Sequence, residues 1–317
     1  MAPRMADTAS PPLVPDGRPR LLFCGSSTLD TIFRVDVLPS GPGKLLPKAM
    51  AVVAHGMAAS AAAAAARLGA EAILFSRLGD DDVGRRICDE LTRAGVDCQS
   101  VGRFPGIASP LCTVIVDDQG ERLVLPYYDP ALPSDAAWLP LHLVPGADAV
   151  LADVRWPDGA AALLDAARAA GRPAVLDADI GPRDVLLDLA RRATHAVFSE
   201  PGARIASGKA EASDALDWLS LHLNAVVAIT LGERGCLWVE ADQLRHVPGH
   251  PVRAVDTLAA GDVFHGVLTW ALAQQVPLGD AMALANAAGA IKCQVFGGRL
   301  GAPTREDLQR FLEAAAP

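Results

Sequence analysis

The chain has 317 residues, of which 51% are hydrophobic and 21% are charged, and its formal net charge is −9. This composition fits a folded α/β-sized chain with a large core and argues against wholesale disorder. The acidic balance argues against a protein that coats nucleic acid, although a local group of basic side chains could still bind a small anion. No charge-free apolar run reaches the roughly 18 residues that span a bilayer, so no membrane segment is predicted.

The six cysteines are widely spaced, without a CxxC pair or a histidine at zinc-ligand spacing. Such cysteines are typical of small buried hydrophobic side chains, and a reducing, cytoplasmic location is expected. Residues 1–19 show no hydrophobic periodicity and lack the apolar block of a signal peptide. We predict a disordered tail over 1–19 and one folded domain over 20–317.

The first half of the chain mixes short strands with two helices. Strands are expected over 21–25, 31–37, 48–54, 73–77, 110–117 and 122–126, and helices over 57–68 and 83–94. Each helix is followed by a glycine where a C-cap should stand. The turn Asp118-Gln119-Gly120 between two apolar segments predicts a hairpin.

The second half alternates strands with helices more regularly. Strands are expected over 149–153, 174–177, 196–199, 225–230, 236–240 and 243–246, and helices over 159–170, 185–192, 211–223, 262–275 and 278–295. This alternation predicts a mainly parallel sheet covered by helices on both faces. The β-rich segments near 31–54 and 110–126 interrupt it, and they predict a small sheet inserted into the larger fold.

The most informative segment is Asp256-Thr257-Leu258-Ala259-Ala260-Gly261-Asp262, which leads directly into a helical pattern. Small residues at a helix start let backbone N–H groups and the helix dipole meet an anion. An aspartate in the first helical turn could then accept the proton of an attacking hydroxyl. The same residues also fit a plain N-cap after a glycine turn, so chemistry alone leaves both interpretations open for Asp262.

This segment resembles the C-terminal signature of the ribokinase (PfkB) sugar kinases, Asp-Thr-x-Gly-Ala-Gly-Asp, with Ala259 in place of the first glycine. The resemblance implies that Asp262 is the catalytic base and that Ala259, Ala260 and Gly261 form the anion hole for the transferred phosphoryl group. It implies ATP and Mg²⁺ as cofactors, with a monovalent cation as a further candidate. We expect Ala259 to do little harm, because its N–H group is what binds.

Other residues match the same family. Thr230, Gly232 and Gly235 follow a strand and fit the family's Thr-x-Gly-x-x-Gly turn, which implies contact with the nucleotide, and Asn286 falls where the family lines its adenine pocket. Asp30 and Gly56 match positions that bind the sugar. The resemblance therefore implies a ribokinase-like three-layer α/β/α sandwich with a small β-sheet lid over the sugar. Exposed lid strands would offer an edge for pairing with a second subunit, so a homodimer through the lid is expected.

The family's Asn-x-x-Glu motif, which helps to organise Mg²⁺, is altered in this chain. Ser199 stands in place of the asparagine and Gly202 in place of the glutamate. The metal ligands are therefore unknown, and Glu200 is a candidate that would act through water. The altered motif also leaves open the interpretation that the protein binds a sugar or nucleotide without catalysing a reaction.

The acceptor is the least determined part of the prediction. Asp153-Val154-Arg155-Trp156 and Lys44 resemble the branch that phosphorylates 6-deoxy-6-sulfofructose, where cations would bind the sulfonate. Arg155 could instead pair with Asp153 or Asp158, and Lys44 could be a solvated loop charge. Pro126 and His55 depart from that branch. A neutral sugar such as fructose, or a nucleoside, therefore stays open beside the anionic ketose.

Three other enzyme classes lack their motifs in this sequence. There is no GxxxxGK[ST] for a P-loop kinase, no GxGxxG after the first strand for a dinucleotide-binding dehydrogenase, and no convincing GxSxG for a serine hydrolase. The sequence predicts a kinase for a small sugar.

Overall fold

The computed structural model of the protein describes residues 4–5 and 12–315. The order in its large sheet is β1 (Arg4–Met5), β15 (Gln243–Val247), β14 (Cys236–Glu240), β13 (Val226–Thr230), β12 (His195–Ser199), β11 (Ala174–Ala178), β10 (Ala149–Asp153), β2 (Arg20–Cys24), β5 (Glu71–Gly79) and β6 (Val96–Asp97), and β7 (Val101–Phe104) also pairs with β5. Most strands of this sheet pair in parallel, and the antiparallel pairs are those of β14 with β13 and with β15.

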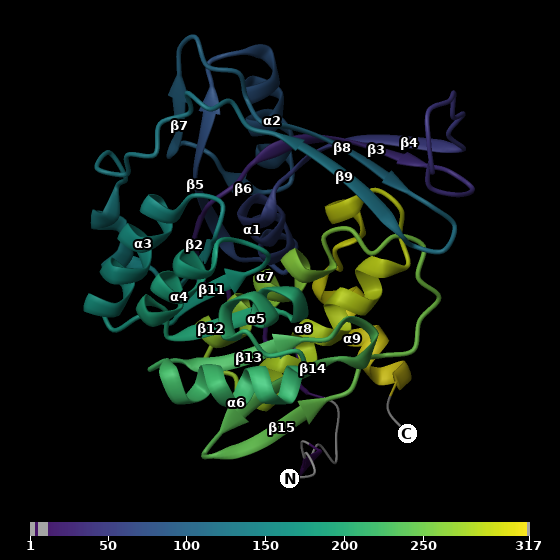
Figure 1. The fold of residues 1–317 in the computed structure, drawn as a ribbon. Helices are drawn as coiled ribbons and strands as arrows, with labels where there is room; N and C mark the ends of the chain where they lie inside the picture. Colours follow the sequence, from purple (N-terminus) through teal and green to yellow (C-terminus); the bar gives the residue numbers. More distant parts are fainter. Residues whose placement is uncertain (1–3, 6–11, 316–317) are drawn as a thin grey trace.

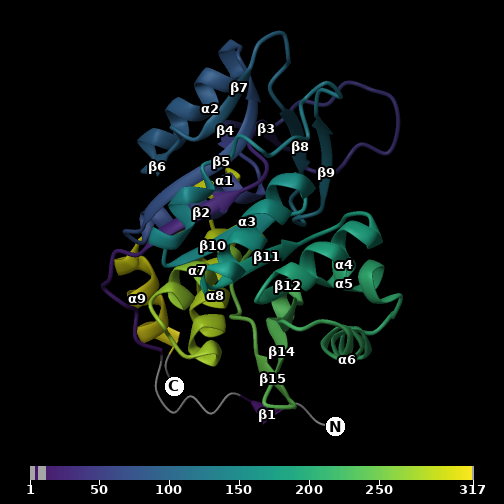
Figure 2. The same cartoon turned by 90° about the vertical axis from the view of Figure 1, so that its left-hand side faces the viewer.

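Helices cover both faces of this sheet (Figures 1 and 2). One face carries α1 (Met57–Arg67), α7 (Ala260–Ala273), α8 (Leu278–Cys293) and α9 (Arg305–Ala315), and the other carries α3 (Pro157–Ala169), α4 (Arg183–Arg192), α5 (Glu200–Ser207) and α6 (Ala212–His222). Successive residues of β2 point to opposite faces, so Leu21 and Phe23 join one core while Leu22 and Cys24 join the other. The predicted parallel sheet between two helical layers is confirmed.

A separate small sheet projects from this body (Figure 1). Its order is β4 (Ala49–His55), β3 (Thr28–Arg34), β8 (Leu111–Val116) and β9 (Arg122–Tyr127). Ile32, Val53 and Val114 are buried in a small core of its own. Helix α2 (Asp82–Arg93) lies against this sheet through β4. The three-layer sandwich with a small β lid is therefore confirmed as the fold.

The remaining segments are short or irregular. The 3₁₀ helices η1 (Leu141–Gly146), η2 (Gly232–Arg234) and η3 (Gly298–Gly301) connect longer elements. Residues 12–19 have no regular structure, and the Arg305 guanidinium donates hydrogen bonds to the carbonyl groups of Asp16 and Gly17. The predicted disorder of residues 1–3 and 6–11 falls outside the described residues. Among the helices of the described ranges, none has the length and apolar character needed to cross a membrane.

Asp153, at the end of β10, fixes the start of α1 against the central strands. One of its carboxylate oxygens accepts hydrogen bonds from the backbone N–H groups of Ser26 (2.8 Å) and Ala58 (3.0 Å), and the other accepts from the N–H of Arg155 (2.8 Å). A Cβ at Gly25 would lie 2.2 Å from this carboxyl group, so glycine is required there. A buried carboxylate that accepts several N–H groups joins the ends of β2 and β10 to α1.

Candidate active site

Asp262 lies in the first turn of α7. The helix begins at Ala260, and Ala259 is its N-cap, with a φ of +66° in the left-handed region. The alternative that Asp262 is itself the N-cap is therefore wrong. Within residues 4–5 and 12–315, no donor bonds its carboxylate. Asp262 thus presents an acceptor that local structure does not use.

The backbone before Asp262 offers free donors. The N–H group of Ala260 bonds the carbonyl of Thr257 at 3.3 Å, whereas those of Ala259, Gly261 and Asp262 have no acceptor in the described part of the chain. A Cβ built on Gly261 would meet nothing within 4 Å, so space is open above the loop. Unused N–H groups at the positive end of a helix suit an anion.

Carboxylates from several elements surround Asp262. Burial raises its pKa well above the usual range, and the negative charges of Asp177, Asp179, Asp153 and Asp30 raise it further. Burial and the charges of Asp179 and Asp153 likewise raise the pKa of Asp177. A bound cation would lower these pKa values, because it stabilises the charged form of each carboxyl group.

The predicted sugar residues Asp30 and Gly56 come together at the base of the lid. Asp30 is almost fully buried, and Thr28 Oγ1 donates a hydrogen bond to one of its oxygens at 2.5 Å. Strand pairing sets Thr28 opposite His55, so Gly56 is next to this pair. Gly56 has a φ of +105°, and a Cβ there would lie 2.4 Å from the carbonyl oxygen of Ser26. Only glycine fits this approach.

His55 lies directly beside Asp30. Its Nδ1 is 3.4 Å from a carboxylate oxygen of Asp30, and its buried Nε2 has no hydrogen-bond partner among the described residues. Burial lowers the pKa of His55, against the opposing effect of the Asp30 charge. A neutral imidazole next to Asp30 can orient that carboxylate. His55 therefore lies beside a predicted sugar-binding residue.

The two cations predicted for an anionic acceptor differ in their surroundings. The Arg155 guanidinium donates to the carbonyl of Ile180 (2.7 Å) and to Asp179 (3.3 Å), with 35% of its side chain exposed. Its carboxylate partner is therefore Asp179, not Asp153 or Asp158. Lys44 is exposed in the loop between β3 and β4 and forms no ion pair with the described residues.

Tyr128 is a candidate that sequence reasoning missed. It directly follows β9, and burial raises the pKa of its hydroxyl to about 12, with Asp153 and Asp30 contributing in the same direction. The charge of Asp30, a predicted sugar residue, therefore acts on this hydroxyl, while 38% of Tyr128 is exposed to solvent. The signal was present as an aromatic pair, Tyr127 and Tyr128, directly after the hairpin that predicted the lid.

The predicted nucleotide residues gather at the turn between β13 and β14. Thr230 ends β13, and Gly232 and Gly235 have positive φ angles in the turn. A Cβ at Gly235 would lie 2.0 Å from the carbonyl oxygen of Val247. Asn286, on α8, donates to that same carbonyl and to the next one, at 3.2 Å each. One side-chain amide thus connects α8 to the segment beside the turn.

Glu200 is engaged by two arginines. Its oxygens lie 2.8 Å from Arg204 and 2.6 Å from Arg234. Ser199, which replaces the expected asparagine, donates to Asp179 at 2.8 Å and caps α5. Over the described ranges, no three His, Cys, Asp or Glu side chains are grouped so that they could hold a metal ion by themselves.

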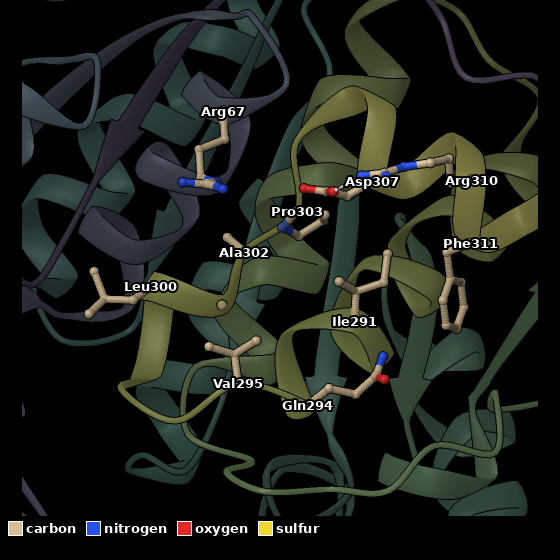
Figure 3. Close-up of a pocket in the computed structure, with 11 residues that line it drawn as sticks. Arg67, Ile291, Gln294, Val295, Leu300, Ala302, Pro303, Asp307, Arg310 and Phe311 are labelled. Atoms are coloured by element: carbon tan, nitrogen blue, oxygen red, sulfur yellow. Dashed lines mark hydrogen bonds and ion pairs between the residues drawn. The ribbon is translucent and has the colours of Figure 1, made fainter. Parts of the chain in front are cut away.

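An open pocket of about 480 Å³ lies away from these residues (Figure 3). It lies among α8, η3, α9 and the end of α1. Its lining includes Arg67, Ile291, Val295, Leu300, Asp307 and Phe311. None of the predicted catalytic, nucleotide-binding or sugar-binding residues lines it, so the pocket does not belong to the candidate active site.

Comparisons with known proteins agree with this arrangement. The sequence profile of the pfkB family carbohydrate kinases matches residues 19–305. A fructokinase of Klebsiella pneumoniae is 30% identical over 303 residues, which cover 88% of this chain and 96% of that protein. The profile and this relative both span nearly the whole chain, so they concern the entire fold.

Two solved structures have the same fold. A crystal structure from Agrobacterium tumefaciens, provisionally called a ribokinase, is 43% identical, with a TM-score of 0.91 over 94% of this chain and 98% of that one. An Escherichia coli protein provisionally called ribokinase II, in complex with ATP and Mg²⁺, is 19% identical, with a TM-score of 0.80 over 94% and 99%. With the profile match, these likenesses establish that the chain belongs to the pfkB family of carbohydrate kinases, phosphotransferases that act on sugar hydroxyls.

Proposed function

We propose that this protein transfers the γ-phosphate of ATP to a hydroxyl group of a ketose-type sugar, with Asp262 as the general base. The observation that carries the proposal is the first turn of α7. A carboxylate without a hydrogen-bond partner and free backbone N–H groups lie side by side there. Phosphoryl transfer needs these two elements, one to take the hydroxyl proton and one to stabilise the transferred group.

The proposed roles follow from the site. The N–H groups of Ala259, Gly261 and Asp262 bind the phosphoryl oxygens, and Ala260 keeps this turn in place through Thr257. Asp30, Gly56 and Tyr128 hold the sugar at the base of the lid. Thr230, Gly232, Gly235 and Asn286 surround the nucleotide. The lid then excludes water, which limits hydrolysis of ATP.

Mg²⁺ fits the acidic surroundings of Asp262. When bound, it neutralises charge between the β- and γ-phosphates of ATP. Mg²⁺ keeps several waters and takes few protein ligands, which agrees with carboxylates that are near one another without forming a closed metal site. Asp177 would supply oxygens on this side. Asp179, bonded by Ser199 and Arg155, and Glu200, bonded by two arginines, would act through water.

Replacing Asp262 by asparagine tests the base. Asp262→Asn keeps the shape and removes the proton acceptor, so kcat should fall by about 10²- to 10⁴-fold. Calorimetric titration should show ATP affinity within about twofold of wild type, because the anion-binding N–H groups remain. Asp214→Asn is the control, since Asp214 is an exposed acid in the first turn of α6. Asp262→Asn with most of its turnover intact would refute the proposed mechanism.

The second candidate acceptor is a ketose with a sulfonate at its sixth carbon. The exposed Lys44 and the partly exposed Arg155 favour it, since both cations could reach an anion at the edge of the site. The carboxylates around Asp262 favour a neutral ketose. ADP release with fructose, fructose 6-phosphate, 6-deoxy-6-sulfofructose and a nucleoside distinguishes these classes. No turnover with any of them would support the non-catalytic binding protein.

Arg155 provides the sharper test of that second candidate. Arg155→Ala should raise KM for the anionic ketose about tenfold, while KM for fructose stays within about twofold. The neutral sugar is the internal control, because loss of the Asp179 contact affects both substrates. Equal changes in both KM values would show that Arg155 does not recognise the anion.

The lid sheet is also proposed as the site of a homodimer. β9 is an edge strand, and it exposes large apolar side chains to solvent. An exposed apolar edge pairs readily with a second copy of itself. The exposed side chains on this sheet are Met50, Leu111, Leu123, Val124, Leu125 and Tyr127.

A further inference from the structure

A buried ion pair lies directly beneath the loop that precedes Asp262. Lys292, near the end of α8, and Asp256, at the start of the loop, both have fully buried side chains. Lys292 Nζ is 3.4 Å from a carboxylate oxygen of Asp256 and also donates a hydrogen bond to the backbone carbonyl of Asp256. The ammonium group therefore holds the side chain and the main chain of the same residue.

The Asp256 carboxylate also accepts hydrogen bonds from the surrounding backbone. One carboxylate oxygen accepts the N–H of Leu258 at 2.8 Å, and the other accepts those of Gly297 and Gly298 at 2.9 Å each. Its own N–H bonds the carbonyl of Cys293 at 3.1 Å. The loop, the end of α8 and the start of η3 are thus joined at one carboxylate. The next residues along the loop are the proposed anion hole.

We propose that Lys292 is a positioning residue for phosphoryl transfer, and that its ammonium group serves as a built-in monovalent cation beneath the anion hole. This inference rests on the proposed function. The Lys292 ammonium would take the place of the bound monovalent cation that the family resemblance implied, because it already supplies one positive charge at Asp256. Wild-type activity should therefore not depend on added potassium or ammonium ions.

Charge is the reason that the ammonium matters. An uncompensated carboxylate at Asp256 would repel the phosphates that bind a few residues along the chain, and it would be left buried without a cation. The carbonyl of Asp256 would also lose its donor, so the peptide that leads to Thr257 would be free to turn. Both effects move the free N–H groups away from the position in which they stabilise the transferred group.

Two variants separate charge from packing. Lys292→Met keeps most of the side-chain volume without the charge, and Lys292→Ala leaves a cavity that a small cation can enter. We expect kcat to fall about 10²-fold in each, because displaced anion-hole donors cost about that much. Ammonium or methylammonium ions should restore kcat of Lys292→Ala at least tenfold. These ions should not restore kcat of Lys292→Met, because the methionine side chain fills the space. They should also leave kcat of the wild type unchanged. Tetramethylammonium at equal ionic strength is the inert salt.

The outcomes are distinct from those of the proposed function. If wild type itself transfers no phosphate, the proposed function fails first. If wild type is active and Lys292→Met keeps wild-type kcat, or if Lys292→Ala folds by circular dichroism and shows no response to ammonium, the positioning role is refuted. The single Lys292 variants could misfold because they leave the Asp256 carboxylate buried without a cation. The double variant Asp256→Asn with Lys292→Met removes both charges, so it tests the proposal without that cost. That double variant should fold and stay slow, and wild-type kcat in it would overturn the proposal.

Discussion

Ala259 holds a backbone conformation that its side chain disfavours. A φ of +66° costs an L-residue about 1–2 kcal/mol, which glycine does not incur. The family signature has glycine at this position. The expectation that Ala259 does little harm considered its N–H group alone and left out its φ angle. The strain stands at the N-cap of the helix that carries Asp262.

Ala259→Gly should therefore stabilise the protein. We expect a gain of about 1 kcal/mol in the free energy of unfolding, after allowing for the extra freedom of glycine in the unfolded chain. Urea denaturation measures it. Ala260→Gly is the matched control, because Ala260 is helical and should lose about 0.5–1 kcal/mol. Equal losses in both variants would show that Ala259 is not strained.

Asp262 should make stability depend on pH. Its pKa is raised in the folded state, so folding favours the protonated form and stability falls as pH rises from the usual aspartate value of about 4 towards the raised value. Asp262→Asn removes this loss. Its melting temperature should exceed that of wild type at pH 8 and approach it at pH 4. A constant difference across that range would contradict the raised pKa.

At the scale of elements, residues 256–259 form the loop before α7, here called the phosphoryl loop. Among the described residues, one side-chain hydrogen bond joins the lid to this loop, and Leu258 of the loop packs against the small core of the lid. Arg122, at the start of β9, donates a hydrogen bond to Thr257 Oγ1 at 2.9 Å. Arg34, on lid strand β3, instead bonds Asp118 within the lid. The lid thus contacts the loop that leads to the anion hole, and this contact can report on lid closure.

Removing the Arg122 contact should loosen the lid. Arg122→Ala should raise KM for the sugar by about three- to tenfold, because an exposed charged hydrogen bond contributes about 1 kcal/mol. ADP formation without sugar should rise relative to phosphate transfer, since water enters more readily. A coupled assay of ADP with quantification of sugar phosphate measures both. Arg34→Ala is the control, and equal effects from both variants would argue against a specific role.

Local patterns predicted the elements well and the contacts between them poorly. Alternating strands and helices predicted the two-faced sheet, and the segment before Asp262 predicted a helix start beside an anion site. The Asp179 partner of Arg155 and the position of Tyr128 depend on distant segments that meet only in the fold. The left-handed conformation of Ala259 was missed because alanine gives no signal for it. The roles of the named site residues stay predictions until the variants are measured.

For the whole molecule, the exposed lid predicts assembly. Leu125→Lys places a charge on the apolar edge strand, where 52% of the leucine is exposed, and should convert a dimer to a monomer. Light scattering after size exclusion gives the mass. Leu221→Lys is the control, because Leu221 is 84% exposed on α6. A wild-type mass equal to that of Leu125→Lys would refute a dimer through the lid.

Helix α8 makes contacts with two parts of the proposed site. Asn286 holds the segment beside the nucleotide turn, and Lys292, about 9 Å further along the helix axis, holds the phosphoryl loop. Because both residues lie on one helix, a tilt of α8 would change both contacts together. If the proposed nucleotide binding tilts α8, nucleotide binding and the ordering of the phosphoryl loop would share one equilibrium, and thermodynamic reciprocity would apply. A sugar that orders the loop would then tighten the nucleotide by the same factor by which the nucleotide tightens the sugar.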